Sequence, residues 1–304
     1  MSTPKPNILR TAEERFSFLP AFPYAPNYVD DLAGYEGMRM AYMDEGPRDA
    51  ETTFLCLHGE PSWSYLYRKM LPVFTGTGCR VVAPDLFGFG RSDKPVDDTA
   101  YSFDFHRDSL LRLIERLDLK NVALVCQDWG GLLGLTIPMA MPERFTRLLV
   151  MNTAIPIGKP ISDGFEFWKN FAAQAPDIPV AGIIAGDAAG AVNMMDAVAY
   201  DAPFPDASYK AGVRAFPQLV PVEPGMGGIE HGLAARKFFA NDWTGESFMA
   251  IGLRDIVLGE EVMMDLRSII KGCPEPMKIP EAGHFVQEYG EPIARAAVEH
   301  FGLT

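Results

Sequence analysis

The segment VALVCQDWGG, which begins at Val122, constrains the fold more than any other part of this sequence. A short β-rich run leads to a carboxylate, Asp128, and two glycines then allow a helix to start close to the strand. Such a strand–turn–helix exposes one side chain above the edge of a sheet, where it can act as a nucleophile. An aspartate before a helix can also be no more than an N-cap. The small residues Gly130 and Gly131 favour a nucleophile at Asp128.

Runs of the same kind recur along the chain, and stretches with helical periodicity separate them. The apolar runs occupy residues 53–57, 80–83, 122–125, 148–151, 248–252 and 277–279. Helical spacing of apolar residues is found at residues 105–117, 132–141 and 292–301. Buried strands that alternate with helices predict an α/β fold with a mostly parallel, doubly wound sheet. Sites in such sheets lie at the carboxyl ends of the strands.

Two regions depart from this alternation. The first fifty residues, rich in proline and acidic side chains, predict a segment that wraps the surface or forms a hairpin at the sheet edge. The region 156–229 is rich in alanine, proline, glycine and methionine and shows no strand pattern. Short helices are expected there at residues 163–173, 189–198 and 208–215. We therefore expect a helical cap at residues 156–229, inserted into an α/β core made of residues 1–155 and 230–304.

The charge and composition of the chain restrict its partners. With 40 acidic and 27 basic residues, the formal net charge is −13, so binding to nucleic acid or to an anionic membrane is not expected. No apolar run reaches the roughly 18 residues of a membrane helix. Residues 1–6 do not resemble a signal or transit peptide, which predicts a cytoplasmic protein. The cysteines show no metal-ligand spacing, and Cys56 and Cys126 lie in apolar runs that predict buried thiols.

A general base is expected after the last predicted strand, where His284 stands in the sequence IPEAGHF. The other histidines fit other places. His58, at a strand end, predicts a structural role, and His231 lies in an acidic, glycine-rich loop. His106 and His300 fall on helices with charged neighbours, where exposure to solvent is expected. His284 is therefore the predicted base.

An acid that orients this histidine is expected between the nucleophile and the base in chain order. Asp255 follows a predicted strand and satisfies that order. Asp85 also ends a strand, but its glycine-rich surroundings predict a turn. In some relatives of such chains the acid follows the strand after the nucleophile helix. Asn152 stands at that place here and cannot act as a carboxylate. The predicted triad is Asp128, His284 and Asp255.

The loop HGEP, which begins at His58, follows the first buried strand. Loops at this position supply one backbone N–H of an oxyanion hole, and the residue after the nucleophile supplies the other. We therefore expect the N–H groups of Glu60 and Trp129 to stabilise negative charge on a reacting oxygen. This use of the Glu60 backbone leaves its side chain free for a separate role.

These motifs resemble the haloalkane dehalogenases of the α/β-hydrolase fold. In the core, the resemblance rests on HGEPSWSYLYRKM from His58, VVAPDLFGFGRSDKP from Val81, QDWGG from Gln127, MAIGLRD from Met249 and AGHFVQE from Ala282. In the expected cap it rests on FEFWK from Phe165 and PFPDASYKAGVRAFP from Pro203. The resemblance implies an α/β-hydrolase fold with an inserted helical cap and an Asp-His-Asp triad.

The resemblance also implies a hydrolytic dehalogenation in two steps. Asp128 would displace the halide from carbon and form an alkyl ester. His284, oriented by Asp255, would then activate the water that hydrolyses this ester. The indole N–H groups of Trp129 and Trp168 would hold the halide ion, because indole donates hydrogen bonds and accepts none.

The implied substrate is a small halogenated aliphatic compound, and the products are a primary alcohol, a halide ion and a proton. Phe165, Phe216 and Pro217 are expected to line the substrate pocket. No metal ion or organic cofactor is implied. The implied role is detoxification, and a monomer is the default expectation.

Two other functions fit parts of the same sequence. An epoxide hydrolase would use the same triad together with cap tyrosines that protonate the epoxide oxygen, and Tyr200 and Tyr209 stand in the expected cap. A non-catalytic ligand-binding protein could keep the fold, but it has no need of two carboxylates and a histidine at three strand ends. The sequence of the cap favours the dehalogenase.

Overall fold

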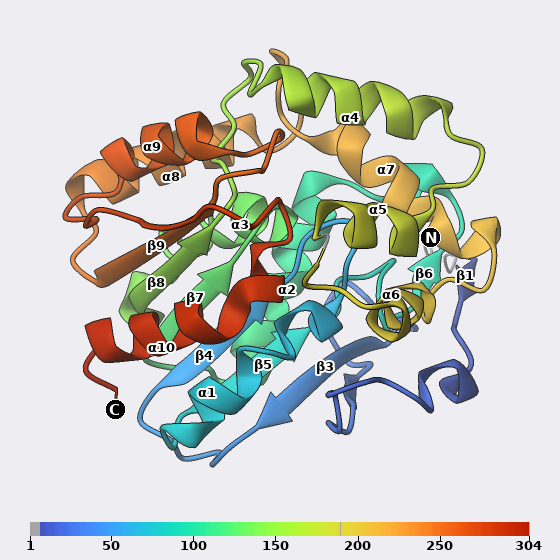
Figure 1. Cartoon of the computed structure of the whole chain (residues 1–304), viewed down its shortest axis with the longest axis horizontal. Helices are drawn as coiled ribbons and strands as arrows, with labels where there is room; N and C mark the ends of the chain where they lie inside the picture. The colour runs from blue at the N-terminus through green and yellow to red at the C-terminus, as the bar shows by residue number, and fades with distance from the viewer. Residues whose placement is uncertain (1–6, 189, 304) are drawn as a thin grey trace.

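An eight-stranded sheet crosses the middle of the molecule in the computed structural model, which describes residues 7–188 and 190–303 (Figure 1). The strand order is β10 (Met277–Ile279), β9 (Glu246–Gly252), β8 (Phe145–Met151), β7 (Val122–Cys126), β4 (Thr53–Leu57), β5 (Arg80–Pro84), β3 (Met40–Glu45) and β2 (Asn27–Val29). The strands from β10 to β5 pair in parallel, and β3 and β2 continue the sheet as an antiparallel edge. The predicted, mostly parallel sheet and its edge hairpin are confirmed.

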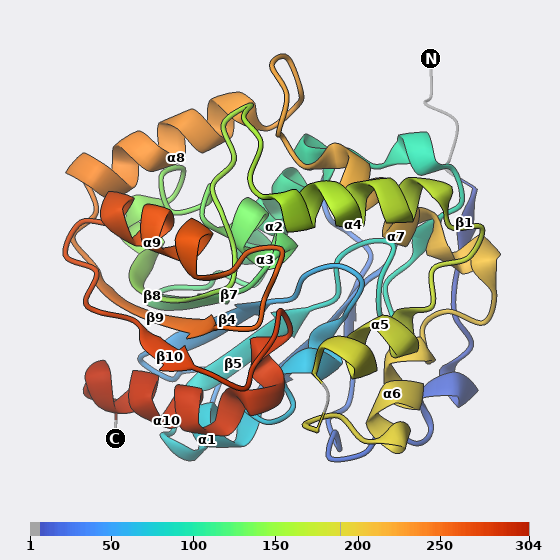
Figure 2. The same ribbon diagram turned by 45° about the horizontal axis from the view of Figure 1, so that its top comes forward.

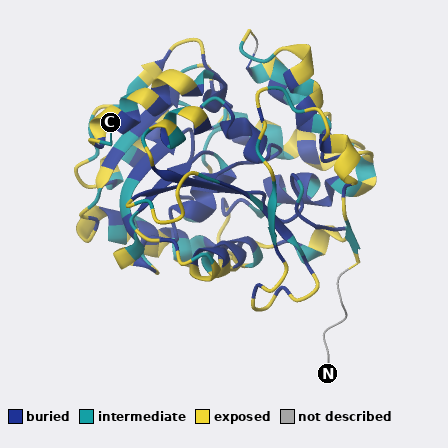
Figure 3. Ribbon diagram, turned by 90° about the horizontal axis from the view of Figure 1, so that it is seen from below, coloured by how far each residue is buried: buried dark blue, intermediate teal, exposed yellow. Residues whose placement is uncertain are grey.

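The central strands are apolar because both of their faces are covered. Every residue of β4, β5 and β7 is buried. Figure 3 shows the sheet as a buried layer between helices whose outer faces are exposed. Parallel strands in this position read as continuous apolar runs rather than as an alternating pattern. Cys56 and Cys126 are buried in β4 and β7, as predicted.

Helices cover the two faces of the sheet (Figure 2). One face carries α1 (Leu71–Gly76) and α10 (Gly290–His300), which pack against each other. The opposite face carries α2 (Phe103–Arg116), α3 (Trp129–Gly134), α8 (Ile229–Asn241) and α9 (Glu260–Ile269). The doubly wound arrangement is therefore confirmed, although α3 is earlier and shorter than the helix predicted at residues 132–141.

Between β8 and β9 the chain leaves the sheet. It forms α4 (Asp163–Gln174), α5 (Val180–Asp187), α6 (Met194–Asp201) and α7 (Ala211–Leu219) before α8 begins. Figure 1 shows these four helices grouped beyond the ends toward which the parallel strands point. No helix in the described part of the chain is long and apolar enough to cross a membrane.

The helices between β8 and β9 agree only in part with the sequence analysis. The helices expected at residues 163–173 and 208–215 overlap α4 and α7. The helix expected at residues 189–198 begins at Met194, and its expected first residue, Ala189, lies outside the described residues. Helix α5 was not predicted from the sequence, because its apolar residues do not keep to one face.

Candidate active site

Asp128 stands between β7 and α3 on a strained turn. Its backbone angles are φ 48° and ψ −127°, a region that residues other than glycine seldom adopt. The Asp128 side chain makes no capping hydrogen bond to α3. Its carboxylate turns instead toward the loop after β4, where Oδ1 accepts the Glu60 N–H at 2.8 Å. The Asp128 side chain is therefore presented to the edge of the sheet and does not serve as an N-cap.

Glycines allow three backbone segments to meet at this turn. A Cβ on Gly130 would lie 1.9 Å from a backbone carbonyl oxygen at the end of β4. A Cβ on Gly131 would lie 2.1 Å from the hydroxyl oxygen of Thr153, which follows β8. On the facing loop, a Cβ on Gly59 would lie 2.4 Å from the Cβ of Asp128. Distances this short exclude any side chain at the three positions, so the glycines fix Asp128 against its neighbours.

His284 lies on the loop after β10, between two carboxylates. Its Nδ1 is 2.9 Å from Oδ2 of Asp255, and its Nε2 is 3.5 Å from Oδ2 of Asp128. Burial by itself would lower the pKa of His284. The two neighbouring carboxylates, Asp255 foremost, outweigh burial and raise this pKa well above the ordinary 6.5. The structure thus brings the three predicted triad residues together, with His284 between the two aspartates.

Asp255 is surrounded by hydrogen-bond donors. Its Oδ1 accepts the N–H groups of Val257 at 2.7 Å and Leu258 at 3.0 Å, and its Oδ2 accepts the side-chain amide of Asn152 at 2.8 Å. Burial raises the pKa of Asp255, but the charge of His284 and the hydrogen bonds from His284, Leu258 and Val257 outweigh burial and lower it. Asp255 is therefore kept ionised beside the imidazole.

Asn152 belongs to the site, although its position in the sequence indicates only that a carboxylate is missing there. Its Oδ1 accepts the Gly252 N–H at 2.8 Å while its Nδ2 donates to Asp255. A side-chain amide can accept from β9 and donate to Asp255 at the same time, which an ionised carboxylate cannot do. The sequence signal for Asn152 is its place at the end of β8, the strand next to β9.

A cavity of about 170 Å³ opens beside Asp128 and His284. Apolar side chains of α4, α5 and α7 form much of its wall. Besides the two catalytic candidates, the side chains that line it include Glu60, Trp129, Phe165, Phe167, Trp168, Ile183, Asp187, Pro217, Val220, Ile256 and Phe285. Both predicted halide ligands and two of the three predicted pocket residues, Phe165 and Pro217, therefore lie in the wall.

Phe216 does not line this cavity, so its prediction as a pocket residue is wrong. It is fully buried behind Trp129, with the two ring centroids 4.5 Å apart. Neighbouring residues of a helix point about 100° apart, so Pro217 borders the cavity while Phe216 points into the core. His106 packs against the same phenylalanine at 4.6 Å and is buried, so the predicted exposure of His106 is also wrong.

Glu60 places a buried carboxyl group in the wall. Burial, and then the charge of Asp128, raise the pKa of Glu60 well above the ordinary 4.5, although the charge of His284 opposes the shift. The Oε1 atom of Glu60 has no hydrogen-bond partner among the residues that the structure describes. Burial therefore favours the protonated form of Glu60. Two backbone N–H groups were expected as oxyanion donors. The Glu60 N–H donates to Asp128. The Asp128 side chain makes no capping hydrogen bond to the first turn of α3, which begins with Trp129.

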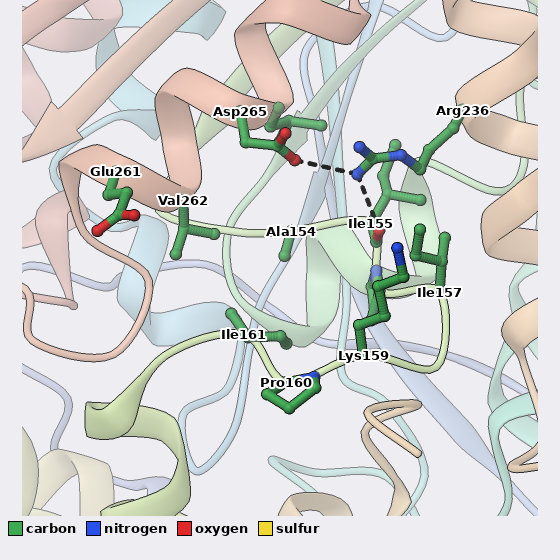
Figure 4. A pocket seen from close by; sticks show the side chains of 12 residues that line it. Ala154, Ile155, Ile157, Lys159, Pro160, Ile161, Arg236, Glu261, Val262 and Asp265 are labelled. Carbon is green, nitrogen blue, oxygen red and sulfur yellow. Dashed lines mark hydrogen bonds and ion pairs between the residues drawn. The ribbon is translucent and has the colours of Figure 1, made fainter. Parts of the chain in front are cut away.

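A second cleft, of about 380 Å³, lies between α8, α9 and the chain after β8 (Figure 4). In it Arg236 pairs with Asp265 at 3.1 Å, and its described lining contains neither histidine nor cysteine. Across residues 7–188 and 190–303, no cluster of three or more His, Cys, Asp or Glu side chains is arranged to hold a metal ion. The cavity beside Asp128 is therefore the candidate active site.

Comparison with known proteins identifies the family and the fold of this chain. Residues 52–291 match the family model described as the alpha/beta hydrolase fold. The chain is 42% identical over 298 residues to a haloalkane dehalogenase from Psychrobacter cryohalolentis, which covers 96% of this chain and 97% of the relative. It is 41% identical to one from Mycolicibacterium paratuberculosis, with 93% and 94% covered. Among solved structures, a tetrameric haloalkane dehalogenase from Paraglaciecola agarilytica NO2 superimposes with a TM-score of 0.95 at 64% identity, covering 96% of this chain and 98% of that one.

Proposed function

This chain belongs to the haloalkane dehalogenases of the α/β hydrolase fold and hydrolyses carbon–halogen bonds, and we propose that Asp128, His284 and Asp255 carry out the reaction. The observation that carries the proposal is the orientation of the Asp128 carboxylate. Its Oδ1 accepts the Glu60 N–H at 2.8 Å, and its Oδ2 lies 3.5 Å from Nε2 of His284 at the wall of an apolar cavity. One oxygen is held by a backbone donor while the other is available for attack.

In the first step, Oδ2 of Asp128 attacks the carbon that bears the halogen. A C–O bond forms, the carbon–halogen bond breaks, and the halide leaves with the bonding electron pair. The hydrogen bond to Oδ1 fixes the carboxylate for in-line attack. The products of this step are an alkyl ester of Asp128 and a halide ion.

Trp129 and Trp168 are the proposed ligands of the departing halide. Both indoles border the cavity, one from α3 and one from α4. An indole N–H stabilises an anion and cannot itself compete as a nucleophile. The raised pKa of Glu60 supports this assignment, because burial disfavours an ionised carboxylate in the cavity wall, where it would repel the halide.

In the second step, water attacks the ester carbonyl carbon and gives a proton to His284. The Glu60 N–H stabilises the negative charge that develops on the carbonyl oxygen. Esterification has by then removed the charge of Asp128, which is one of the causes that raise the His284 pKa. The pKa of His284 therefore falls when the ester forms, and the imidazole becomes available as a base at the step that needs it.

Collapse of the tetrahedral intermediate breaks the ester bond at the carbonyl carbon and restores the Asp128 carboxylate. The alcohol leaves protonated, and one proton per turnover passes from the site to solvent. Asp255 stays ionised and stabilises the imidazolium meanwhile. The balance is one haloalkane and one water consumed, and one alcohol, one halide ion and one proton formed.

The epoxide hydrolase reading has less support. It requires cap tyrosines that reach the substrate, and neither Tyr200 nor Tyr209 belongs to the cavity wall. Tyr200 is buried and donates its hydroxyl to Glu288. Incubation with styrene oxide and with 1-bromobutane separates the two activities, since a diol without halide would refute the dehalogenase.

The covalent step has a direct test. In a single turnover in H₂¹⁸O, the alcohol should carry the original, unlabelled oxygen of Asp128, and the label should enter the Asp128 carboxylate. Mass spectrometry of the alcohol and of the peptide that contains Asp128 measures both. Label in the first-turnover alcohol would mean that water attacks the haloalkane directly, and the ester mechanism would be wrong.

We further propose that residues 156–229 act as the cap and that copies of this chain associate in solution. A monomer is the default expectation for this sequence, whereas the relative from Paraglaciecola agarilytica NO2 is tetrameric. Exposed apolar side chains on α4 and α6 support association, because a second copy could cover them. Their exposed fractions are 69% for Phe167, 81% for Met194 and 62% for Val198. Light scattering measures the mass, and a monomer at micromolar concentration would refute the association. The cytoplasmic location stays a prediction.

A further inference from the structure

The segment that carries His284 is held from two directions. Gln127, the neighbour of Asp128, donates its side-chain amide to the carbonyl oxygen of His284 at 3.0 Å. Asp187, at the end of α5, accepts two consecutive backbone N–H groups, His284 on Oδ1 and Phe285 on Oδ2, each at 2.9 Å. Hydrogen bonds to an ionised acceptor are shorter and stronger than those between neutral groups. The backbone of the predicted base is therefore fixed by the sheet on one side and by α5 on the other.

Asp187 does not stabilise its own helix. It is the last residue of α5, where the helix dipole disfavours a negative charge. Its two oxygens bind a segment 97 residues away in the chain. Asp187 also borders the same cavity as His284. The position of this carboxylate is thus explained by the histidine segment and not by the stability of α5.

Gly283 completes the contact from the other side. A Cβ on Gly283 would lie 2.4 Å from Oδ1 of Asp187, so a side chain there would push the carboxylate away from the backbone that it binds. The residue before the base must therefore be a glycine if the carboxylate is to reach the backbone. Gly283 and Asp187 are complementary parts of one contact between the chain after β10 and α5.

We propose that Asp187 is a positioning residue for His284, through which α5 holds the base in place for hydrolysis of the ester. The inference rests on the proposed function, in which His284 acts only in the second step. Loss of the Asp187 contact should leave the first-turnover release of halide intact and slow the hydrolysis of the ester. Misplacement of a catalytic group by about 1 Å can cost about 100-fold in rate, so we expect hydrolysis to fall about 10- to 100-fold.

The test is a rapid-quench measurement of both half-reactions with 1-bromobutane in the wild type, Asp187→Ala and Asp187→Asn. Halide released in the first turnover reports alkylation, and the mass of the protein reports the ester. Asp187→Ala should release halide at about the wild-type rate and accumulate ester. Asp187→Asn keeps one acceptor oxygen, so its rate of ester hydrolysis should lie between those of the wild type and Asp187→Ala. A merely structural role would slow both steps together.

Asp201→Asn is the matched control. Asp201 also ends a helix of the inserted segment, α6, and also accepts a backbone N–H, that of Ala181 at 3.1 Å. It does not line the cavity. Both half-reactions of this variant should match the wild type, and selective accumulation of ester in it would overturn the specific role of Asp187.

Gly283→Ala provides a second way to break the contact while the carboxylate stays in the chain. It should also slow hydrolysis selectively, but it should add little to the loss in Asp187→Ala, because the contact is already absent there. Fully additive losses, or equal slowing of both steps, would overturn the proposal.

A wild-type protein that releases halide without ever forming an ester would instead refute the proposed function, so the two failures are distinct. Melting curves identify any variant that does not fold, and the other variant then decides.

Discussion

The part of the cavity wall built on the sheet and the part built on α4 differ in how their side chains are fixed. On the sheet side, the Asp255 carboxylate takes part in four hydrogen bonds, and glycines confine Asp128. On the α4 side, Trp168 is half-buried and stacks on Phe171 with ring centroids 5.7 Å apart, while Phe167 is 69% exposed. Directional bonds fix the first group, whereas apolar contacts that can repack hold the second.

This difference separates chemistry from substrate fit. Catalytic groups need distances kept to fractions of an ångström, which networks of hydrogen bonds provide. The fit of an apolar substrate depends on the volume and outline of the wall, which apolar side chains adjust at modest cost. Substitutions on the sheet side should therefore change the rate of one chemical step. Substitutions on the α4 side should change affinity and substrate range.

The largest effect is expected from Asp128→Asn. An amide is not an anionic nucleophile, so turnover of 1-bromobutane should fall by about 10⁴-fold or more. Asparagine tolerates a positive φ better than most residues, so the melting temperature should stay close to that of the wild type. An unchanged rate of halide release would move the nucleophile away from the sheet side and remove the contrast between the two walls.

His284→Gln should stop the reaction at the ester. Halide is expected in full in the first turnover, because the base takes no part in the displacement. Hydrolysis should then fall about 10²- to 10⁴-fold, since no general base activates the water. The increase in mass of the peptide that contains Asp128 measures the trapped ester. Unmodified protein after exposure to substrate would contradict the two-step scheme.

Substitution of Trp129 and of Trp168 compares the two parts of the cavity wall directly. Trp168→Phe removes one donor to the halide, and a lost hydrogen bond to a charged group costs about 1.5–3 kcal/mol, or about 10- to 100-fold in halide affinity. Trp129→Phe should have a similar effect on affinity and should also lower the melting temperature, because Trp129 is buried against Phe216. Quenching of fluorescence by bromide measures binding. Undiminished affinity in Trp168→Phe would exclude that indole from the halide site.

The smallest expected effect is a change in the titration of His284. Asp128→Asn removes one of the charges that raise the His284 pKa, so the pKa should fall below its wild-type value. Between the two pKa values, the imidazole is protonated in the wild type and neutral in the variant. Trp168→Phe, on the α4 side, should leave the titration unchanged. Imidazole ¹⁵N shifts measured against pH provide the comparison. If the pKa does not fall, ester formation cannot activate the base in the way proposed.

The sheet side could be predicted from the sequence because its residues stand at strand ends. The carboxyl ends of parallel strands meet at one edge, so a strand-end position is already a position in space. Asp128, Asp255 and His284 follow β7, β9 and β10, and the structure brings them together. Asn152 needed one more fact, the pairing of β8 with β9, which the order of strands along the chain does not determine.

The opposite wall was harder to predict for a physical reason. Short helices over a cavity have no long apolar stripe, and a small rotation decides which side chain faces the substrate. Phe216 and Pro217 differ in this way. The contact between Asp187 and the His284 backbone lacks any sequence pattern, because α5 has no distinct apolar face and its partner lies on another loop.

The glycines around Asp128 also determine which positions near the cavity can be substituted in a search for new activity. A side chain at Gly59 would collide with Asp128 itself, and one at Gly130 or Gly131 would collide with the end of β4 or the chain after β8, so substitutions at these positions should disturb the proposed nucleophile before any substrate enters. Substitution of the residues of α4 and α7 that line the cavity should leave the Asp128 carboxylate in place. A library that holds the three glycines and Trp168 constant and varies the other wall residues of α4 and α7 would therefore test substrate range separately from the chemistry.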